Sequence, residues 1–277
     1  MSLAAHWPAL AVLLLLLPAA GQAPPPDLEE AFMRTVRVTR WDDPDSRPET
    51  HAEWRAAMDR AGRMVDGPFQ ATRVYRSPAP IYAAGKRFDL LVHYSLGAPL
   101  DMRLKEYIRD IEAEGWAVTR WSCSGGKPAE VRTFLQGRHT GDRLVGCLIV
   151  GDLPVPWFEM DDDFNNRHSE FPSDLFYMDM DGTWGDKDKD GKYDSHTGSE
   201  QPEIFVGRLT ASPLAGTWGS EAALVDNYFR KLHDFRRGRM AVPRRALAFQ
   251  DDDWYTMNTG QHKAFGRGTM EFLYPEN

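Results

Sequence analysis

The stretch RLVGCLIVGD, residues 143–152, decides the fold class. Its apolar residues run from Leu144 to Val150 without the regular polar alternation of a strand that faces water on one side. Such continuous apolar strands occur almost only in parallel sheets that are covered by helices on both faces. We therefore expect an α/β protein built around this strand.

The segments on both sides of this strand alternate between strand and helix patterns. One example is the helix expected at 101–115, where Leu104, Ile108 and Ile111 share a face and Gly115 ends the periodicity. In chain order we predict strands and helices at 88–94, 101–115, 116–122, 127–139, 143–152, 202–209, 220–238 and 244–250. Strands joined by single helices form right-handed crossovers, so the sheet is predicted to be parallel.

The N-terminus has the pattern of an exported protein. MSLAAHWPALAVLLLLLPAAGQAPPP contains an apolar run that is too short to cross a bilayer, followed by small residues and prolines. We predict a signal peptide at 1–23 and a location outside the cell or in its envelope, with no stable membrane span after cleavage. Residues 24–82 form an N-terminal segment of unclear role, in which Thr50 and Glu53 fit a helix capping box. The α/β domain is assigned to 83–277.

The charge and cysteine content exclude two classes of protein. A net charge of -8 without a basic stripe argues against a nucleic-acid partner, because such proteins neutralise phosphates with clustered Lys and Arg. Two cysteines, Cys123 and Cys147, are too few for a disulfide scaffold. The two cysteines either form a single disulfide or are two buried free thiols, and the sequence leaves both alternatives open.

An acidic insertion at about 153–202 interrupts the α/β pattern, and its centre is DMDGTWGDKDKDGKYD, 179–194. Alternate carboxylates followed by a glycine match the first half of a calcium loop, in which oxygen ligands come from positions one, three and five. The twelfth position is Thr197 instead of Glu, so a further ligand must come from elsewhere, from Asp179, Asp181 or Glu200. The alternative is a solvated loop in which Asp and Gly favour turns. We predict structural calcium with the ligands Asp181, Asp186, Asp188, Asp190 and Asp194.

The sequence contains no cysteine and histidine that a motif or a spacing identifies as a catalytic dyad, so the catalytic residues are unknown. Cys147 lies inside an apolar strand, which suits packing, whereas Cys123 follows a predicted parallel strand but has no histidine tied to it by motif or spacing. His168 and His262 lie in polar segments. Metal-dependent hydrolysis by the aspartates at 161–163 and 251–253 is a further alternative, although adjacent side chains diverge.

The chain resembles the gingipain-like cysteine peptidases, which have a caspase-like α/β fold. The resemblance covers roughly 86–250 and rests on an ordered series of motifs: FDLLVHYS, EGWAVTRW, CLIVGDLP, PSDLFYMDMDGTWGDKDKDGKYD and PEIFVGRLTAS. It implies a caspase-like, parallel-sheet sandwich whose loops are braced by calcium. Asp174 and Arg208 match motif positions of the family, and we expect structural roles for both.

In that family the catalytic His and Cys lie C-terminal to the matched segment. The resemblance therefore implies that 83–277 is a partial domain, incomplete at its C-terminal end, and that the dyad lies beyond Asn277. The expected function is that of the N-terminal portion of a secreted cysteine endopeptidase acting on proteins or peptides, with this chain inactive by itself. The alternative is a non-catalytic, calcium-stabilised secreted α/β binding module.

Overall fold

The computed structural model describes residues 37–39, 49–63, 67–78, 86–163, 167–240, 246–249 and 270–275. The chain divides into two compact units, Arg47–Val242 and a second unit made of Met1–Ser46 and Pro243–Asn277. The predicted signal peptide lies outside the described residues. Within the described part of the chain, no helix has the length and apolar character needed to span a membrane.

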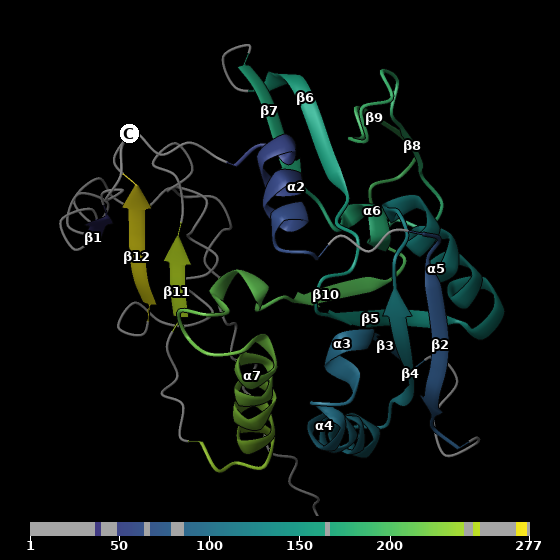
Figure 1. Cartoon of the computed structure of the whole chain (residues 1–277), viewed down its shortest axis with the longest axis vertical. Coiled ribbons are helices and arrows are strands. Elements are labelled where there is room, and N and C mark those ends of the chain that lie inside the picture. Colours follow the sequence, from purple (N-terminus) through teal and green to yellow (C-terminus); the bar gives the residue numbers. More distant parts are fainter. Residues whose placement is uncertain are drawn as a thin grey trace, which may run out of the picture. The chain divides into compact units, whose positions relative to one another are not determined.

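The larger unit is built on a five-stranded mixed sheet (Figure 1). Its strands, in spatial order, are β10 Phe205–Leu209, β5 Leu144–Val150, β3 Arg87–His93, β4 Ala117–Ser124 and β2 Gln70–Arg76. The first four are parallel, and β2 runs antiparallel to β4 at one edge. Read from β4 towards β10, the parallel strands are the second, first, third and fourth along the chain, which is a doubly wound arrangement. The predicted α/β class with a largely parallel sheet is confirmed.

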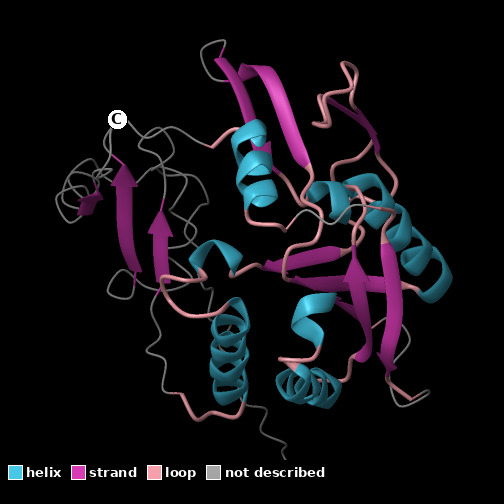
Figure 2. Ribbon diagram, viewed as in Figure 1, coloured by secondary structure: helices cyan, strands magenta, loops and turns pink. Residues whose placement is uncertain are grey.

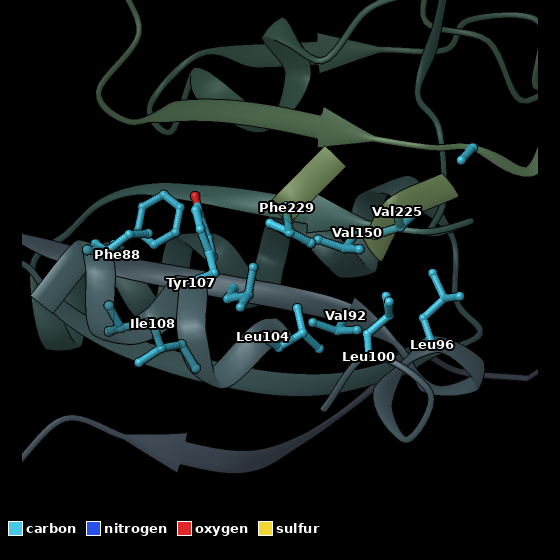
Figure 3. Close-up of a cluster of buried hydrophobic side chains, with 14 residues drawn as sticks. Phe88, Val92, Leu96, Leu100, Leu104, Tyr107, Ile108, Val150, Val225 and Phe229 are labelled. Carbon is cyan, nitrogen blue, oxygen red and sulfur yellow. The ribbon is translucent and has the colours of Figure 1, made fainter. Parts of the chain in front are cut away.

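Helices cover both faces of this sheet (Figure 2). On one face, α4 Asp101–Ala113 and α7 Glu221–Arg236 pack on Phe88, Leu90 and Val92 of β3. Figure 3 shows Phe88 and Val92 in this cluster beside Leu104 of α4 and Phe229 of α7. On the other face, α5 Pro128–Asp142 and α6 Leu175–Met178 pack around Leu91. Alternate residues of a strand point to opposite faces, so the continuous burial of residues 88–92 in β3 shows that both faces of this strand are covered.

A buried ion pair fixes α5 to the centre of the sheet. Asp89 of β3 is fully buried and accepts hydrogen bonds from Arg138 Nε at 2.6 Å and Arg138 Nη2 at 2.9 Å. The indole Nε1 of Trp121 also donates to Asp89, at 2.9 Å. A buried carboxylate needs such partners because desolvation without them is costly.

The insertion forms two antiparallel hairpins around α6. The first consists of β6 Trp157–Asp163 and β7 Arg167–Pro172, and the second of β8 Thr183–Gly185 and β9 Ser195–Thr197. Helix α2, His51–Arg60, contacts the first hairpin: the His51 N–H donates to Glu170 Oε1 at 3.0 Å. The helix begins with the predicted capping box of Thr50 and Glu53.

The remaining described elements are short. In the larger unit, α3 Tyr94–Gly97 follows β3, and the 3-10 helix η1 Ser212–Leu214 precedes α7. The second unit contains a parallel sheet of β1 Arg37–Thr39, β12 Met270–Pro275 and β11 Ala246–Phe249, with β12 in the middle. The strand predicted at 244–250 is thus present as β11, and it pairs with β12 instead of joining the five-stranded sheet.

Candidate metal centre and adjoining cavity

The acidic loop, residues 186–194, connects β8 to β9 and is fastened at its base. The backbone of Tyr193 donates to Trp157 O and accepts from Glu159 N, both at 2.8 Å, which ties the loop to β6. The Tyr193 ring stacks on Phe176 of α6 with a centroid distance of 4.2 Å. The loop is therefore held by the hydrophobic core, in contrast to a freely solvated acidic run.

Backbone N–H groups turn the carboxylates of the loop inward. Gly191 N donates to Asp186 Oδ2 at 3.1 Å, closing the turn from the first to the sixth position. Lys187 N donates to Asp194 Oδ2 at 3.1 Å, and Asp190 N donates to an oxygen of Asp188 at 3.3 Å. Gly191 has a φ of 95°, which a residue with a Cβ adopts only at a cost. The local fold thus agrees with the one, three, five spacing that predicted a calcium loop.

Two carboxylate oxygens of the loop lack a hydrogen-bond partner. Asp186 Oδ1 and Asp194 Oδ1 are each buried, and neither accepts a hydrogen bond in the described structure. Lys187 Nζ lies 3.9 Å from Asp194 Oδ1. An unsatisfied buried carboxylate oxygen costs free energy, whereas an oxygen-rich cluster of this kind suits a hard divalent cation. These two oxygens therefore suit a hard cation, but among the described residues Asp186 and Asp194 belong to none of the three side-chain groups that are close enough together to hold a metal ion.

The structure also shows that a lysine of the acidic loop contacts three carboxylates. Lys192 Nζ lies 2.5 Å from Glu159, 2.9 Å from Glu170 and 2.9 Å from Asp190. Burial by itself would lower the pKa of Lys192, but these three carboxylates outweigh burial and hold its pKa well above the ordinary value. The same contacts hold the pKa of Glu170 and of Asp190 below their ordinary values, against the opposing effect of burial. A metal ion bound by Asp190 would therefore share this carboxylate with Lys192.

Three groups of side chains in the described residues, two of carboxylates alone and one of carboxylates with a histidine, are close enough together to hold a metal ion. One of them, Glu159 with Asp188 and Asp190, combines two predicted ligands with a buried glutamate from β6. Another contains Glu159, His168 and Glu170. Both include carboxylates that pair with Lys192, so a metal at either position would share its ligands with that ammonium group.

The predicted ligand Asp181 belongs to a different group. It lies with Asp179 and Glu203 in the third of these clusters. Asp179 is fully buried and accepts hydrogen bonds from Gly182 N at 2.7 Å, Trp184 Nε1 at 2.6 Å and His196 Nε2 at 2.8 Å. Burial would raise the pKa of Asp179, but these donors outweigh burial and lower it. Asp179 thus fastens the start of the second hairpin.

Neither cysteine has the surroundings of a nucleophile. Cys123 and Cys147 are free and buried. Burial raises the pKa of the Cys123 thiol to about 12, and it raises the pKa of Cys147 further. A thiol attacks as the thiolate, so both residues are suited to packing.

The other candidates from the sequence have different outcomes. His168 is half exposed and lies 2.8 Å from Asp161 Oδ1. His262 and the aspartates at 251–253 lie outside the described residues.

Asp174 and Arg208, for which the sequence resemblance predicted structural roles, contact each other. Arg208 of β10 donates from Nε and Nη2 to the carboxylate of Asp174, at 2.9 and 2.8 Å. The same guanidinium donates to Leu153 O and Pro154 O at 3.0 and 3.1 Å. This bidentate pair links the sheet to the segment after β5 and to the start of α6, as expected of structural residues.

A cavity of about 550 Å³ lies beside the acidic loop. Its walls come from α2, from 125–129 after β4, from 152–155 after β5, and from the acidic loop. The segment at 24–82, for which the sequence suggested no role, thereby contributes one wall through α2. The carboxyl ends of two parallel strands meet at this cavity, which is where α/β proteins commonly bind ligands.

No protein-family model, curated protein or solved structure matches this chain, so the assignment of a function rests on its own residues.

Proposed function

We propose that this chain is the calcium-braced N-terminal portion of a secreted, gingipain-like cysteine endopeptidase with a caspase-like fold. The observation that carries the proposal is the acidic loop, whose backbone curls Asp186 and Asp194 inward and leaves one buried oxygen of each without a hydrogen bond. The α/β sandwich around it, with its doubly wound strand order, is compatible with the fold that the sequence motifs suggest.

Calcium, when bound, neutralises the clustered carboxylates and links the loop to the body of the domain. The chain's own residues perform the remaining structural work. Tyr193 anchors the loop to Phe176, and Asp179 orients the hairpin through Gly182, Trp184 and His196. The proposal gives the loop a bracing role and assigns no chemical step to the ion.

Peptide hydrolysis of this type requires a thiolate next to an imidazole and N–H donors for the oxyanion. The chain has two cysteines, and burial suppresses ionisation of both. We therefore place the catalytic Cys and His outside residues 1–277, and we expect these residues alone to hydrolyse no peptide.

The calcium part is tested by thermal melting with calcium and with a chelator. Calcium at 100 times its dissociation constant should stabilise the fold by about 2.7 kcal/mol, because it binds the folded state only. Asp186→Asn should abolish most of this gain, whereas Asp59→Asn, on the exposed side of α2, should keep it. A melting temperature that is indifferent to both calcium and chelator would contradict the proposal.

The peptidase part is tested on the natural secreted protein, with a mixture of peptides and a thiol alkylator. We expect alkylator-sensitive hydrolysis that persists in Cys123→Ser and Cys147→Ser. Loss of activity in Cys123→Ser would place the nucleophile within this chain and overturn the assignment.

The second candidate is a non-catalytic, calcium-stabilised binding module. It is favoured by an open cavity at the carboxyl ends of β4 and β5, beside which no described cysteine is ionisable at neutral pH. A natural protein that is saturated with calcium, binds peptides and hydrolyses none of them would favour this reading over the peptidase.

A further inference from the structure

The cavity between α2 and the acidic loop has the dimensions and the position of a ligand site. Its volume of about 550 Å³ falls within the roughly 300–1,000 Å³ typical of ligand pockets. Residues 125–129 and 152–155 of its wall directly follow β4 and β5. Ligands of open α/β sheets bind outside the carboxyl ends of the strands, at this edge.

Three cations around the cavity lack an acidic partner. Arg55 of α2, Lys127 before α5 and Lys189 of the acidic loop line it, and none of them forms an ion pair with a described residue. By contrast, the lining residue Arg63 pairs with Asp152 at 3.2 Å, and Asp190 pairs with Lys192. The remaining lining carboxylate, Asp186, forms no ion pair with a described residue, so the three unpaired cations face one unpaired carboxylate and the lining keeps a net positive charge.

The cavity also offers apolar and aromatic surface between these charges. Trp54 and Met58 of α2, Leu153 and Pro154 after β5, and Tyr193 of the loop contribute to its lining. Trp54 packs against the buried Trp157 with a centroid distance of 5.8 Å, so its indole is supported from behind. A supported aromatic ring offers contact area at little cost in conformational entropy.

We propose that this cavity binds an acidic peptide segment. The unpaired cations come from three different elements, which suits several carboxylates spaced along a chain better than one compact phosphate. The inference rests on the proposed function in one respect: calcium would neutralise Asp186 and Asp190 on the same wall, and so would strengthen the positive field of the cavity.

The test uses the full chain saturated with calcium and three blocked octapeptides that differ only in carrying three Glu, three Gln or three Lys. Binding is followed by calorimetry and by tryptophan fluorescence, to which Trp54 contributes. Three additional exposed ion pairs predict roughly tenfold tighter binding of the Glu peptide than of the Gln peptide. We expect the Lys peptide to bind more weakly than both.

Charge-reversal variants locate the site. Arg55→Glu and Lys127→Glu, on separate elements, should each remove most of the preference for the Glu peptide. Arg60→Glu is the matched control, because Arg60 is an exposed cation of the same helix that does not line the cavity. Melting curves verify that each variant is folded, and the two elements provide independent tests.

Several outcomes would overturn the inference: equal affinity for the Glu and Gln peptides, unchanged preference in both variants, or the same loss in the Arg60→Glu control. Complete competition by inorganic phosphate would show a small-anion site and would also overturn it. The calcium proposal fails separately, through a melting temperature that calcium leaves unchanged. A Glu preference that persists in that case would support the cavity assignment without the calcium loop.

Discussion

At the scale of single residues, Lys192 has a larger role than its sequence position suggests. Its ammonium group contacts three carboxylates and is only 12% exposed, so it compensates charge that a metal would otherwise have to neutralise. We predict that Lys192→Met destabilises the fold by about 3–5 kcal/mol, because it leaves Glu159 and Glu170 buried without their cation. Urea denaturation measures the free energy of unfolding of each variant. The control is Lys187→Met, at an exposed lysine of the same loop, which should lower this free energy by under about 0.5 kcal/mol. Equal losses in both variants would show that Lys192 contributes nothing specific.

Asp179 predicts a pH dependence with a definite sign. Its folded pKa lies below the ordinary 3.8, so its stabilisation is present above that pH and is lost as the pH falls through the folded pKa. Asp179→Asn should therefore lower stability at neutral pH and flatten the loss of stability on the acid side of pH 3.8. Denaturant midpoints measured from pH 6 downward in both proteins provide the comparison. If stability fell with decreasing pH at the same rate in both proteins below pH 3.8, the result would contradict the assignment.

At the scale of elements, the inner face of α4 should carry the stability of that helix. Leu104 is fully buried between the sheet and α7, whereas Met102 of the same helix is 83% exposed. Leu104→Ala should cost about 2–5 kcal/mol through lost burial and the cavity that remains. Met102→Ala should change the free energy of unfolding by under about 0.5 kcal/mol, and a similar cost for both would refute the assigned faces.

The same elements show what the sequence could and could not predict. The helices at 101–115 and 220–238 and the strand at 143–152 were predictable, because their apolar periodicity reflects burial on a definite face. The position of α2 was not, because its contact with Glu170 joins residues 119 positions apart and has no local pattern. The partners of Lys192 were missed for the same reason. The curled acidic loop was predictable because its hydrogen bonds are local.

At the scale of the whole molecule, the boundary of the main unit differs from the one that periodicity suggested. The α/β pattern begins after residue 82, but the compact unit begins at Arg47 and includes α2 and β2. Strand β2 pairs with β4 along its length, from Gln70 with Ser124 to Arg76 with Thr119. Without residues 47–82, the loss of β2 would leave β4 as an exposed sheet edge, and the loss of α2 would remove one wall of the cavity.

Two fragments can test whether the main unit begins at Arg47 or after residue 82. Both hydrophobic clusters and all described contacts of the acidic loop lie within 47–242, so this fragment should unfold in one cooperative transition that calcium shifts upward. The fragment 83–242 keeps the acidic loop but lacks α2 and β2, so it should melt at a lower temperature and self-associate through the open β4 edge. Calorimetry and light scattering at equal concentration distinguish the two. If 83–242 were as stable and as monomeric as 47–242, residues 47–82 would be dispensable for the fold. The contribution of α2 would then be limited to the cavity, and it would be measured by comparing the ligand affinity of the two fragments.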